Sequence, residues 1–512
     1  MNPRGPRPNP STEVVDGIIE RASRYLLDAP MGSDPVIAHA SPSELATAFA
    51  ATVGLGFADD AAAHSVSEVL ASVDQIIDYS VHTSHPRFVN QNFAAADPVA
   101  VVGDWLGAAL NTTAATFEAA PVFTLMESAV LHKLGRMVGY VEDGVSATDT
   151  PVGVPVLPPG IFCAGGSMGT LLALQLARHR LQPEMTVRGA SGDRLVLFVS
   201  DTGHYAASKS AALLGIGTEG VVKVATDHEG AMLPDALDVA ITEAIARGQT
   251  PFAVIGTAGT TVTAAFDDLD AVADICESRG LWLHVDAAYG GSALFSPTHA
   301  ARLRGVHRSD SCVWNLHKMV GMTQQCTALL VKAPAQLEEC FATHADYLFQ
   351  SDKLYADYDS GDRTFQCARR IDVLKLWLAW KVGGDAGFAA RIDHAVAMAD
   401  YTRYCIAESD VAFVPIVAGT FTNVVFVWVP PHLRPLAAPE AVDLDVLTEL
   451  NRCAPLIKAR LQAAGTGLIG FQPVHGVNSF RMICMSPMLQ PSDVDALLEA
   501  IETAGNDVAA TQ

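Results

Sequence analysis

A lysine and an aspartate stand at the ends of two apolar runs. Lys318 closes the sequence Asn315-Leu316-His317-Lys318, and Asp286 follows the apolar run 281–285. Apolar surroundings lower the pKa of a lysine and free its amine to attack a carbonyl. A buried carboxylate needs a cation beside it, and a protonated pyridine is such a cation. Pyridoxal phosphate chemistry requires this pair, so we predict that Lys318 forms a Schiff base and that Asp286 holds the pyridine nitrogen.

Asp286 also has an alternative reading as a turn cap or a metal ligand. In a strand, alternate residues share a face, so His284 would lie on the same side as Asp286 and could complete a metal pair. No third ligand is near them in the sequence. We therefore expect a cofactor carboxylate and no metal.

Three further groups follow apolar runs or open helical patterns. Gly166 and Ser167 begin a helix whose free amides could bind phosphate, although a tight turn with a serine cap is an equal alternative. His204 could stack on a flat cofactor, or it could be structural. Thr261 could bind a cofactor hydroxyl, or it could belong to a polar turn. Ligand sites of open α/β sheets form at the carboxyl ends of strands, so the convergence of these groups favours one site.

The elements that must position these groups alternate as strand and helix after Gly160, which is typical of βαβ units. We predict an α/β fold with a mostly parallel sheet. The expected strands are 195–200, 221–225, 252–257, 282–286, 311–314 and 326–331, and the expected helices are 168–180, 206–214, 234–247 and 269–279.

The flanking regions differ in texture. Residues 35–142 have a helical pattern that is broken by a loop at 85–98, and residues 145–159 form a surface connection. After Gly383 we expect a smaller α+β unit, with a helix at 388–409, a strand pair within 411–429, a helix at 446–464 that Pro455 kinks or splits, a strand at 480–485 and a last helix. This predicts an N-terminal helical segment at 1–100 with a disordered tail at 1–12, a large cofactor domain at 101–385 and a small C-terminal domain at 386–512.

Composition excludes several classes of protein. The 33 basic residues against 56 acidic ones give a net charge of -23, which repels nucleic acid. No apolar run approaches the roughly 18 residues of a membrane helix, and no secretory signal opens the chain. The nine cysteines are scattered without CxxC pairs, which favours a reducing cytoplasm.

Several motifs resemble the group II pyridoxal phosphate decarboxylases, in particular the glutamate and cysteine sulfinate decarboxylase branch. These motifs are His85-Pro86-Arg87-Phe88-Val89-Asn90-Gln91, Phe117-Glu118-Ala119-Ala120-Pro121-Val122-Phe123, Tyr347-Leu348-Phe349-Gln350, Gly361-Asp362 and Gln366-Cys367. The resemblance implies the aspartate aminotransferase-like fold (fold type I), pyridoxal 5'-phosphate as cofactor and a lyase that converts an L-amino acid to an amine and carbon dioxide.

The resemblance also implies a role for each site residue. Lys318 would form the Schiff base, Asp286 would pair with the pyridine nitrogen and His204 would stack on the ring. The phosphate would be held by Gly166, Ser167, Asn315 and His317, and Thr261 would lie near the ring hydroxyl. Tyr347 would donate a proton from a loop, and a neighbouring subunit would complete the site, which implies a homodimer.

The resemblance places the substrate contacts at Gln91, Phe93 and Arg481. Phe93 is more like the cysteine sulfinate side of the branch, so we expect glutamate, aspartate or cysteine sulfinate as substrate. Leu316, where the family usually has proline, and Ala206, where it usually has serine, depart from the pattern and bear on substrate shape.

Other readings remain open at this point. Within the same cofactor class, the alternatives are decarboxylation of 2,4-diaminobutyrate or an aromatic amino acid, an aminotransferase and an aldehyde-forming enzyme; Tyr347 argues against the last. A Rossmann-type dehydrogenase is disfavoured, because no acidic residue ends a strand about 20 residues after the glycine-rich turn, as a ribose site requires. A silent interaction protein would not need Lys318, Asp286 and His204 together.

Overall fold

The computed structural model describes most of the chain. The described residues are 12–28, 35–57, 59, 63–142, 157–189, 192–343, 345, 349, 352–409, 411–436 and 438–510. The predicted tail therefore lies outside the described residues up to Thr12, which begins helix α1 (Thr12–Leu27). The predicted connection at 145–159 is described only from Leu157.

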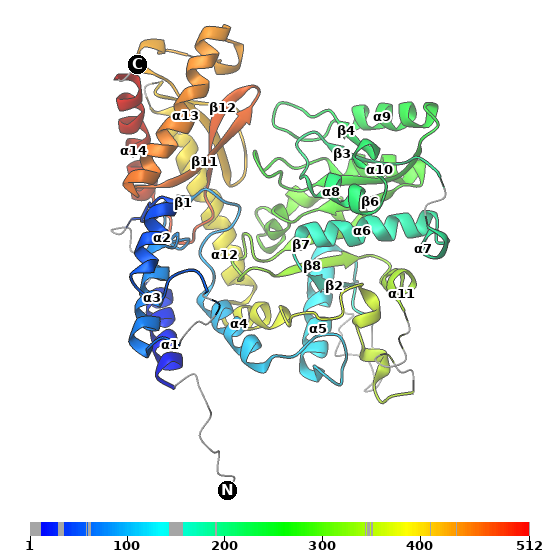
Figure 1. Cartoon of the computed structure of the whole chain (residues 1–512). Helices are drawn as coiled ribbons and strands as arrows, with labels where there is room; N and C mark the ends of the chain where they lie inside the picture. The colour runs from blue at the N-terminus through cyan, green and yellow to red at the C-terminus, as the bar shows by residue number, and fades with distance from the viewer. Residues whose placement is uncertain are drawn as a thin grey trace.

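A seven-stranded sheet forms the centre of the larger part of the molecule (Figure 1), with the strand order β2-β8-β7-β6-β5-β3-β4. Its strands are β2 (Gly160–Cys163), β3 (Leu195–Ser200), β4 (Val221–Val224), β5 (Thr250–Thr257), β6 (Trp282–Asp286), β7 (Ser311–Asn315) and β8 (Thr327–Val331). The five strands from β7 to β4 are parallel, whereas β8 is antiparallel to both of its neighbours. The predicted α/β class and mostly parallel sheet are confirmed.

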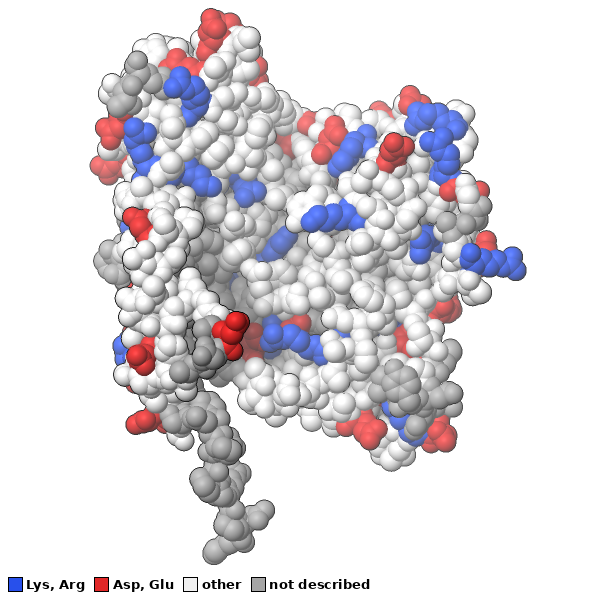
Figure 2. All heavy atoms as spheres, in the orientation of Figure 1, with Lys and Arg blue, Asp and Glu red and all other residues white. Residues whose placement is uncertain are grey.

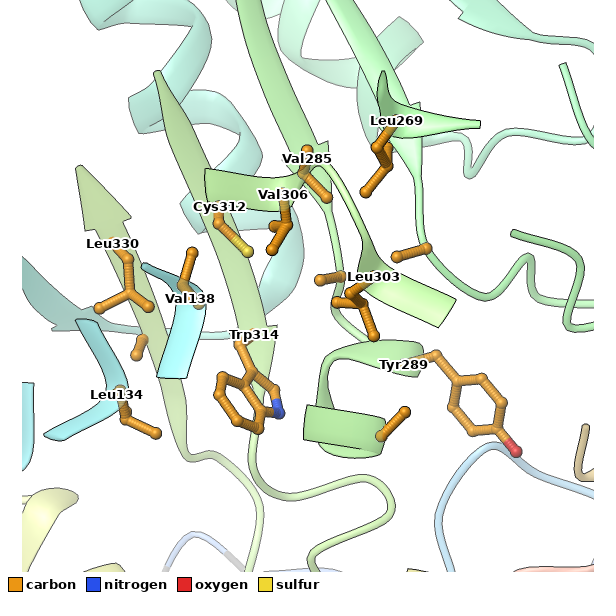
Figure 3. Close-up of a cluster of buried hydrophobic side chains, with 14 of the residues drawn as sticks. Leu134, Val138, Leu269, Val285, Tyr289, Leu303, Val306, Cys312, Trp314 and Leu330 are labelled. Carbon is orange, nitrogen blue, oxygen red and sulfur yellow. The ribbon is translucent and has the colours of Figure 1, made fainter. Parts of the chain in front are cut away.

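Helices cover both faces of this sheet because the strands are apolar on both sides. One face packs on α6 (Gly166–Leu181), α8 (Ala206–Leu213) and α11 (Ala335–Phe341). The other packs on α5 (Pro121–Val138), α9 (Pro234–Ala246), α10 (Leu269–Arg279) and α12 (Val373–Ala407). Alternation along β3 sends Leu197 to the first layer and Phe198 to the second. Figure 3 shows part of the second layer, in which Leu134, Val138, Cys312 and Trp314 pack together.

The strand predictions missed β2. Gly160 to Cys163 is short and follows a proline pair, so its apolar run carried little signal of its own, yet all four residues are buried. It completes the sheet by pairing with β8. The short helix α7 (Met185–Arg188) was also not predicted.

The C-terminal part has its own five-stranded sheet, in the order β1-β11-β12-β10-β9. Its strands are β1 (Phe88–Val89), β9 (Phe413–Pro415), β10 (Asn423–Trp428), β11 (Leu468–Val474) and β12 (Val477–Ile483). The sequence prediction missed β11 and placed β1 in a loop. Pro455 does not split α13, which runs unbroken over Leu444–Ala464, and α14 (Pro491–Ala510) follows. The α12 backbone departs from helical geometry at Gly384, next to the boundary that we predict at residue 385.

Four further helices precede α5 in the chain. They are α1, α2 (Pro42–Ala50), α3 (Val66–Tyr79) and α4 (Pro98–Leu110). Figure 1 shows α1 to α3 beneath the C-terminal part, and α4 packs along α12. Strand β1 leads from these helices into the C-terminal sheet by pairing with β11. Among the helices that the structure describes, none is both long enough and apolar enough to cross a bilayer.

Candidate active site

The carboxyl ends of five strands meet at one edge of the large sheet. Strands β3, β5, β6 and β7 are parallel, and β2 runs in the same direction because both β2 and β7 are antiparallel to β8. The register places Cys163 and Asn315 on either side of Thr327. The segments that follow these ends therefore converge on one place.

A cavity of ≈ 330 Å³ lies where these segments converge. All eight residues that we predicted to bind the cofactor line it: Gly166, Ser167, His204, Thr261, Asp286, Asn315, His317 and Lys318. The other lining residues are Tyr205, Ala206, Thr257, Gly259, Ala288, Tyr289 and Gln324. Figure 2 shows this side of the molecule hollowed between the C-terminal part and the large sheet, with basic side chains along the hollow.

Lys318 and Asp286 both line the cavity, and their charges interact there. Burial lowers the pKa of the Lys318 amine, and the negative charge of Asp286 partly opposes that shift. The amine lies 6.0 Å from the centre of the Tyr289 ring. Asp286 accepts a hydrogen bond from the backbone N–H of Ala288 (3.1 Å) through Oδ1. A lysine with a lowered pKa more readily loses its proton and becomes a nucleophile.

The opposite wall of the cavity is shaped to receive an anion. Helix α6 begins at Gly166, and a Cβ added there would come within 2.9 Å of Asn315 Nδ2. Asn315 Oδ1 accepts a hydrogen bond from Thr327 (3.0 Å), which fixes the orientation of the amide. Only glycine leaves room between the start of the helix and this amide. The α6 amino terminus, the Ser167 hydroxyl and the Asn315 amide suit a phosphate group.

His317 is held in one protonation state. Its Nδ1 lies 3.1 Å from the backbone N–H of Cys326 and 3.0 Å from the carbonyl oxygen of the same residue. This carbonyl oxygen already accepts from the backbone N–H groups of Leu316 (2.9 Å) and His317 (3.3 Å), so Nδ1 serves as the acceptor for the Cys326 N–H. Burial lowers the pKa of His317 to about 4. The ring is then neutral at physiological pH, with its proton on Nε2, where it can donate to an anion.

His204 lies on a third wall. Its Nδ1 accepts a hydrogen bond from Ala206 N–H (3.2 Å), which leaves Nε2 as the protonated nitrogen. Burial lowers the pKa of His204, and Asp286 opposes the shift. The Tyr205 ring packs beside it, with 4.0 Å between the ring centres. A neutral imidazole fixed in this way presents a flat face to the cavity.

Sequence reasoning did not single out several residues of the cavity wall. Thr257 ends β5 directly beside Asp286 in the sheet register, and its buried hydroxyl has no hydrogen-bond partner among the described residues. Gly259 has a φ of +87°, and a Cβ there would come within 2.9 Å of Gly290 N. The signal for Thr257 was its place at a strand end next to Asp286. Tyr289 and Gln324 carried no comparable signal.

The predicted substrate residues do not line the cavity. Arg481 contacts the cavity wall, because its guanidinium donates to the backbone oxygen of Thr261 (3.1 Å), and it also donates to that of Asn90 (3.0 Å). Gln91 is exposed, and Phe93 packs against the Phe88 ring, with 5.7 Å between the ring centres. Tyr347 lies outside the described residues.

The structure bears on the metal alternative for Asp286 and on the two departures from the family pattern. The described residues contain no group of three His, Cys, Asp or Glu side chains that could hold a metal. His284 is fully buried and bonds Ser311 Oγ through Nδ1 (2.9 Å). Leu316 is also fully buried in the core and does not line the cavity, so its departure from the usual pattern does not shape the cavity wall, whereas Ala206 does line it.

The wall chemistry fits pyridoxal phosphate. A glycine cradle beside Asn315 suits the phosphate, and the unpartnered Thr257 hydroxyl and the Asp286 carboxylate offer polar contacts to a heteroaromatic ring. An amine with a lowered pKa suits its aldehyde. The pyridoxal-dependent decarboxylase conserved domain matches residues 57–429. The chain belongs to the pyridoxal-dependent decarboxylase family, and its cofactor is pyridoxal phosphate.

Comparisons with individual proteins place the chain within the glutamate and cysteine sulfinate decarboxylase branch. It is 42% identical to the acidic amino acid decarboxylase GADL1 of Bos taurus over 86% of this chain and 81% of the relative. It is 43% identical to the cysteine sulfinic acid decarboxylase of Rattus norvegicus, over 87% of each chain. The crystal structure of mouse CSAD in its apo form superposes with a TM-score of 0.88 at 38% identity, over 96% of this chain and 98% of that chain. The resemblance seen in the sequence is confirmed.

Proposed function

We propose that the enzyme decarboxylates a short acidic L-amino acid, with glutamate, aspartate and cysteine sulfinate as the candidate substrates. The observation that carries the proposal is the half-buried Arg481 guanidinium against the Thr261 wall of the cavity. Its Nε has no hydrogen-bond partner among the described residues. A carboxylate or sulfinate is the natural partner for such a group. The relatives named for acidic amino acids and for cysteine sulfinic acid support the same substrate class.

Eight residues would hold the cofactor. Pyridoxal phosphate, when bound, supplies an aldehyde that condenses with amines and a protonated ring that accepts electrons from a breaking bond. Gly166, Ser167, Asn315 and His317 would bind its phosphate. Asp286 would keep the ring nitrogen protonated, His204 would lie against the ring, Thr261 would contact the ring hydroxyl and Lys318 would bind the aldehyde carbon.

The remaining steps belong to groups that position the substrate and move protons. Arg481 would orient the acidic side chain or carboxylate by charge-assisted hydrogen bonds, with Gln91 and Phe93 completing the substrate contacts. Lys318, with its lowered pKa, can take up and release a proton inside the cavity. Tyr347 would donate a proton to Cα after carbon dioxide has left.

The assembly is proposed to be a homodimer with the active site at the subunit interface. An apolar stripe on α4 supports this, because Val102, Trp105, Leu106 and Leu110 are all exposed and are spaced to share one helix face. Val122 and Leu125 at the start of α5 are also exposed. Light scattering on wild-type protein and on a Leu106→Glu variant tests the interface. A monomeric wild type would contradict the dimer.

The compartment is proposed to be the cytoplasm. All nine cysteines are unpaired, which suits a reducing environment. Fractionation of cells that make the protein at its natural level tests the location. Recovery in a membrane or secreted fraction would contradict it.

Two measurements test the activity itself. The purified protein should be yellow, and the colour should be absent from Lys318→Ala; a colourless wild type that takes up no added cofactor would contradict the site. Carbon dioxide release should then be screened with glutamate, aspartate, cysteine sulfinate, 2,4-diaminobutyrate and aromatic amino acids. Arg481→Ala should weaken binding of the acidic substrate by about tenfold or more. Arg452 is an exposed arginine on α13, and Arg452→Ala should leave this binding unchanged. Preference for a neutral or basic substrate would overturn the acidic assignment.

A further inference from the structure

A buried chain of hydrogen bonds joins the C-terminal sheet to two walls of the cavity. Tyr289, Thr422 and Asn423 are 2%, 0% and 0% exposed. The Tyr289 hydroxyl contacts Thr422 Oγ1 and donates to Asn423 Oδ1 (3.0 Å). The Asn423 amide nitrogen donates to the backbone oxygens of Val262 (2.9 Å) and Thr261 (3.2 Å). Asn423 thus contacts both Tyr289 and the Thr261 segment.

The direction of this chain follows from its acceptors. Two backbone carbonyls can only accept, so the Asn423 amide must point its nitrogen at them and its oxygen at Tyr289. Tyr289 then donates to Asn423 and accepts from Thr422. Each atom of the Asn423 amide therefore has a defined role. Removing one of these groups would leave buried polar atoms without partners, which costs more than the bond itself contributes.

Asn423 and Arg481 hold the same loop. Arg481 pairs with Val425 across β10 and β12, and alternate residues share a face, so Asn423 and Arg481 lie on one face of the C-terminal sheet. Both donate to the Thr261 carbonyl. The placement of the Arg481 guanidinium beside the Thr261 wall therefore depends on a segment that Asn423 also fixes.

Asn423 also holds Tyr289, which forms another part of the cavity wall. Figure 3 shows its ring at the edge of the apolar cluster, with the hydroxyl directed away from Trp314. The ring lines the cavity, 6.0 Å from the Lys318 amine. The hydroxyl is the only polar group of the side chain, and it is hydrogen-bonded to Thr422 and to Asn423 at the start of β10.

We propose that Asn423 is a positioning residue that sets Tyr289 and the Thr261 segment relative to Lys318 and Arg481. Asn423 itself does not line the cavity. This inference rests on the proposed function only where it concerns the acidic substrate, because Tyr289 and Thr261 line the cofactor cavity whichever substrate is used.

The test compares holoenzymes with substitutions at this chain. Asn423→Asp puts an oxygen against the two carbonyls, Asn423→Ala removes the amide and Tyr289→Phe removes only the hydroxyl. Asn478→Asp is the matched control, because the Asn478 amide nitrogen likewise donates to a carbonyl, that of Asn451 (2.8 Å), away from the cavity. The readouts are the visible circular dichroism of the bound cofactor, the KM for the acidic substrate and the thermal midpoint.

We expect the visible dichroism to fall about twofold or more and KM to rise about tenfold in the Asn423 variants and in Tyr289→Phe, with Asn478→Asp like wild type. Asn423→Ala combined with Tyr289→Phe should be no worse than the worse single variant, because the two residues act as one unit. Wild-type dichroism and KM in variants with a lowered thermal midpoint would overturn the proposal, as would additive effects. If an Asn423 variant fails to fold, Tyr289→Phe decides alone. If wild type acts on no acidic amino acid, the proposed function fails, and the dichroism still decides the role of Asn423.

Discussion

Gly166 and Asn315 lie so close together that a methyl group on the glycine would come within 2.9 Å of the asparagine Nδ2. Gly166 follows β2 and Asn315 ends β7, two strands that run in the same direction on either side of β8. Both residues line the cavity, and the phosphate is proposed to bind beside them.

The first prediction concerns this contact. Gly166→Ala should weaken pyridoxal phosphate binding by about tenfold, because the new methyl group displaces the Asn315 amide. Equilibrium dialysis of the cofactor measures the effect. Gly387→Ala is the control, since Gly387 is exposed in α12 and a Cβ there meets no atom within 4 Å. That control should keep wild-type affinity and gain roughly 0.5 kcal/mol of stability. Equal affinity in both variants would contradict the phosphate site.

A second prediction concerns the carboxylate beside Lys318. Asp286→Ala should lower kcat by about a hundredfold or more at saturating cofactor, because the ring nitrogen loses the group that keeps it protonated. The pKa of Lys318 should also fall further, since Asp286 raises it in the wild type. Asp201→Asn, at an exposed position after β3, serves as the control and should keep full kcat. A small loss in Asp286→Ala would remove that residue from the proposed mechanism.

Stability should depend on pH through buried histidines. Burial lowers the pKa values of His284 and His317 to about 4, whereas an unfolded histidine titrates near about 6.5. Between those values the unfolded chain binds protons that the folded chain does not, so stability falls as the pH drops from about 6.5 to about 4. The fully buried His284 contributes roughly 3 kcal/mol to this loss. Asp267 opposes it, because burial raises its pKa to about 6.

Urea unfolding at about pH 7 and about pH 5 measures this dependence. The wild-type midpoint should be lower at the acidic pH. His317→Gln removes one titrating group and should show a smaller decrease between the two conditions. An equal decrease in both proteins would show that His317 titrates normally in the folded state.

The sequence predicted the parts of the site that lie at strand ends. Apolar runs located β3 and β6 with their observed bounds, and a parallel sheet then brings their carboxyl ends to one edge. This is why His204 and Asp286 could be assigned to one cavity. A strand that is buried on both faces of a sheet is apolar along its whole length, so its position can be read from the sequence.

The parts that the sequence did not predict depend on contacts between distant segments. Asn423 lies 162 residues from Thr261 in the chain, and nothing in either segment marks the hydrogen bond between them. Strand β2 was missed because four buried residues give too short a pattern. Pro455 was expected to interrupt a helix that runs on through it, since packing of α13 on the C-terminal sheet outweighs the lost hydrogen bond.

The last prediction concerns the ion pair that anchors β2. Glu127 and Arg369 are 5% and 3% exposed, with 2.8 Å between Oε1 and Nη1. The same carboxylate accepts the backbone N–H of Phe162 in β2 (3.1 Å), and Arg369 also donates to Ala114 O. Arg369→Met should cost roughly 3–5 kcal/mol of stability because it leaves Glu127 charged and unpaired. Glu127→Leu combined with Arg369→Met should recover part of this loss, since neither member of the pair is then left buried without the other. Denaturant unfolding measures both variants, and a double variant less stable than Arg369→Met would show that the backbone contacts of Glu127 matter more than its charge.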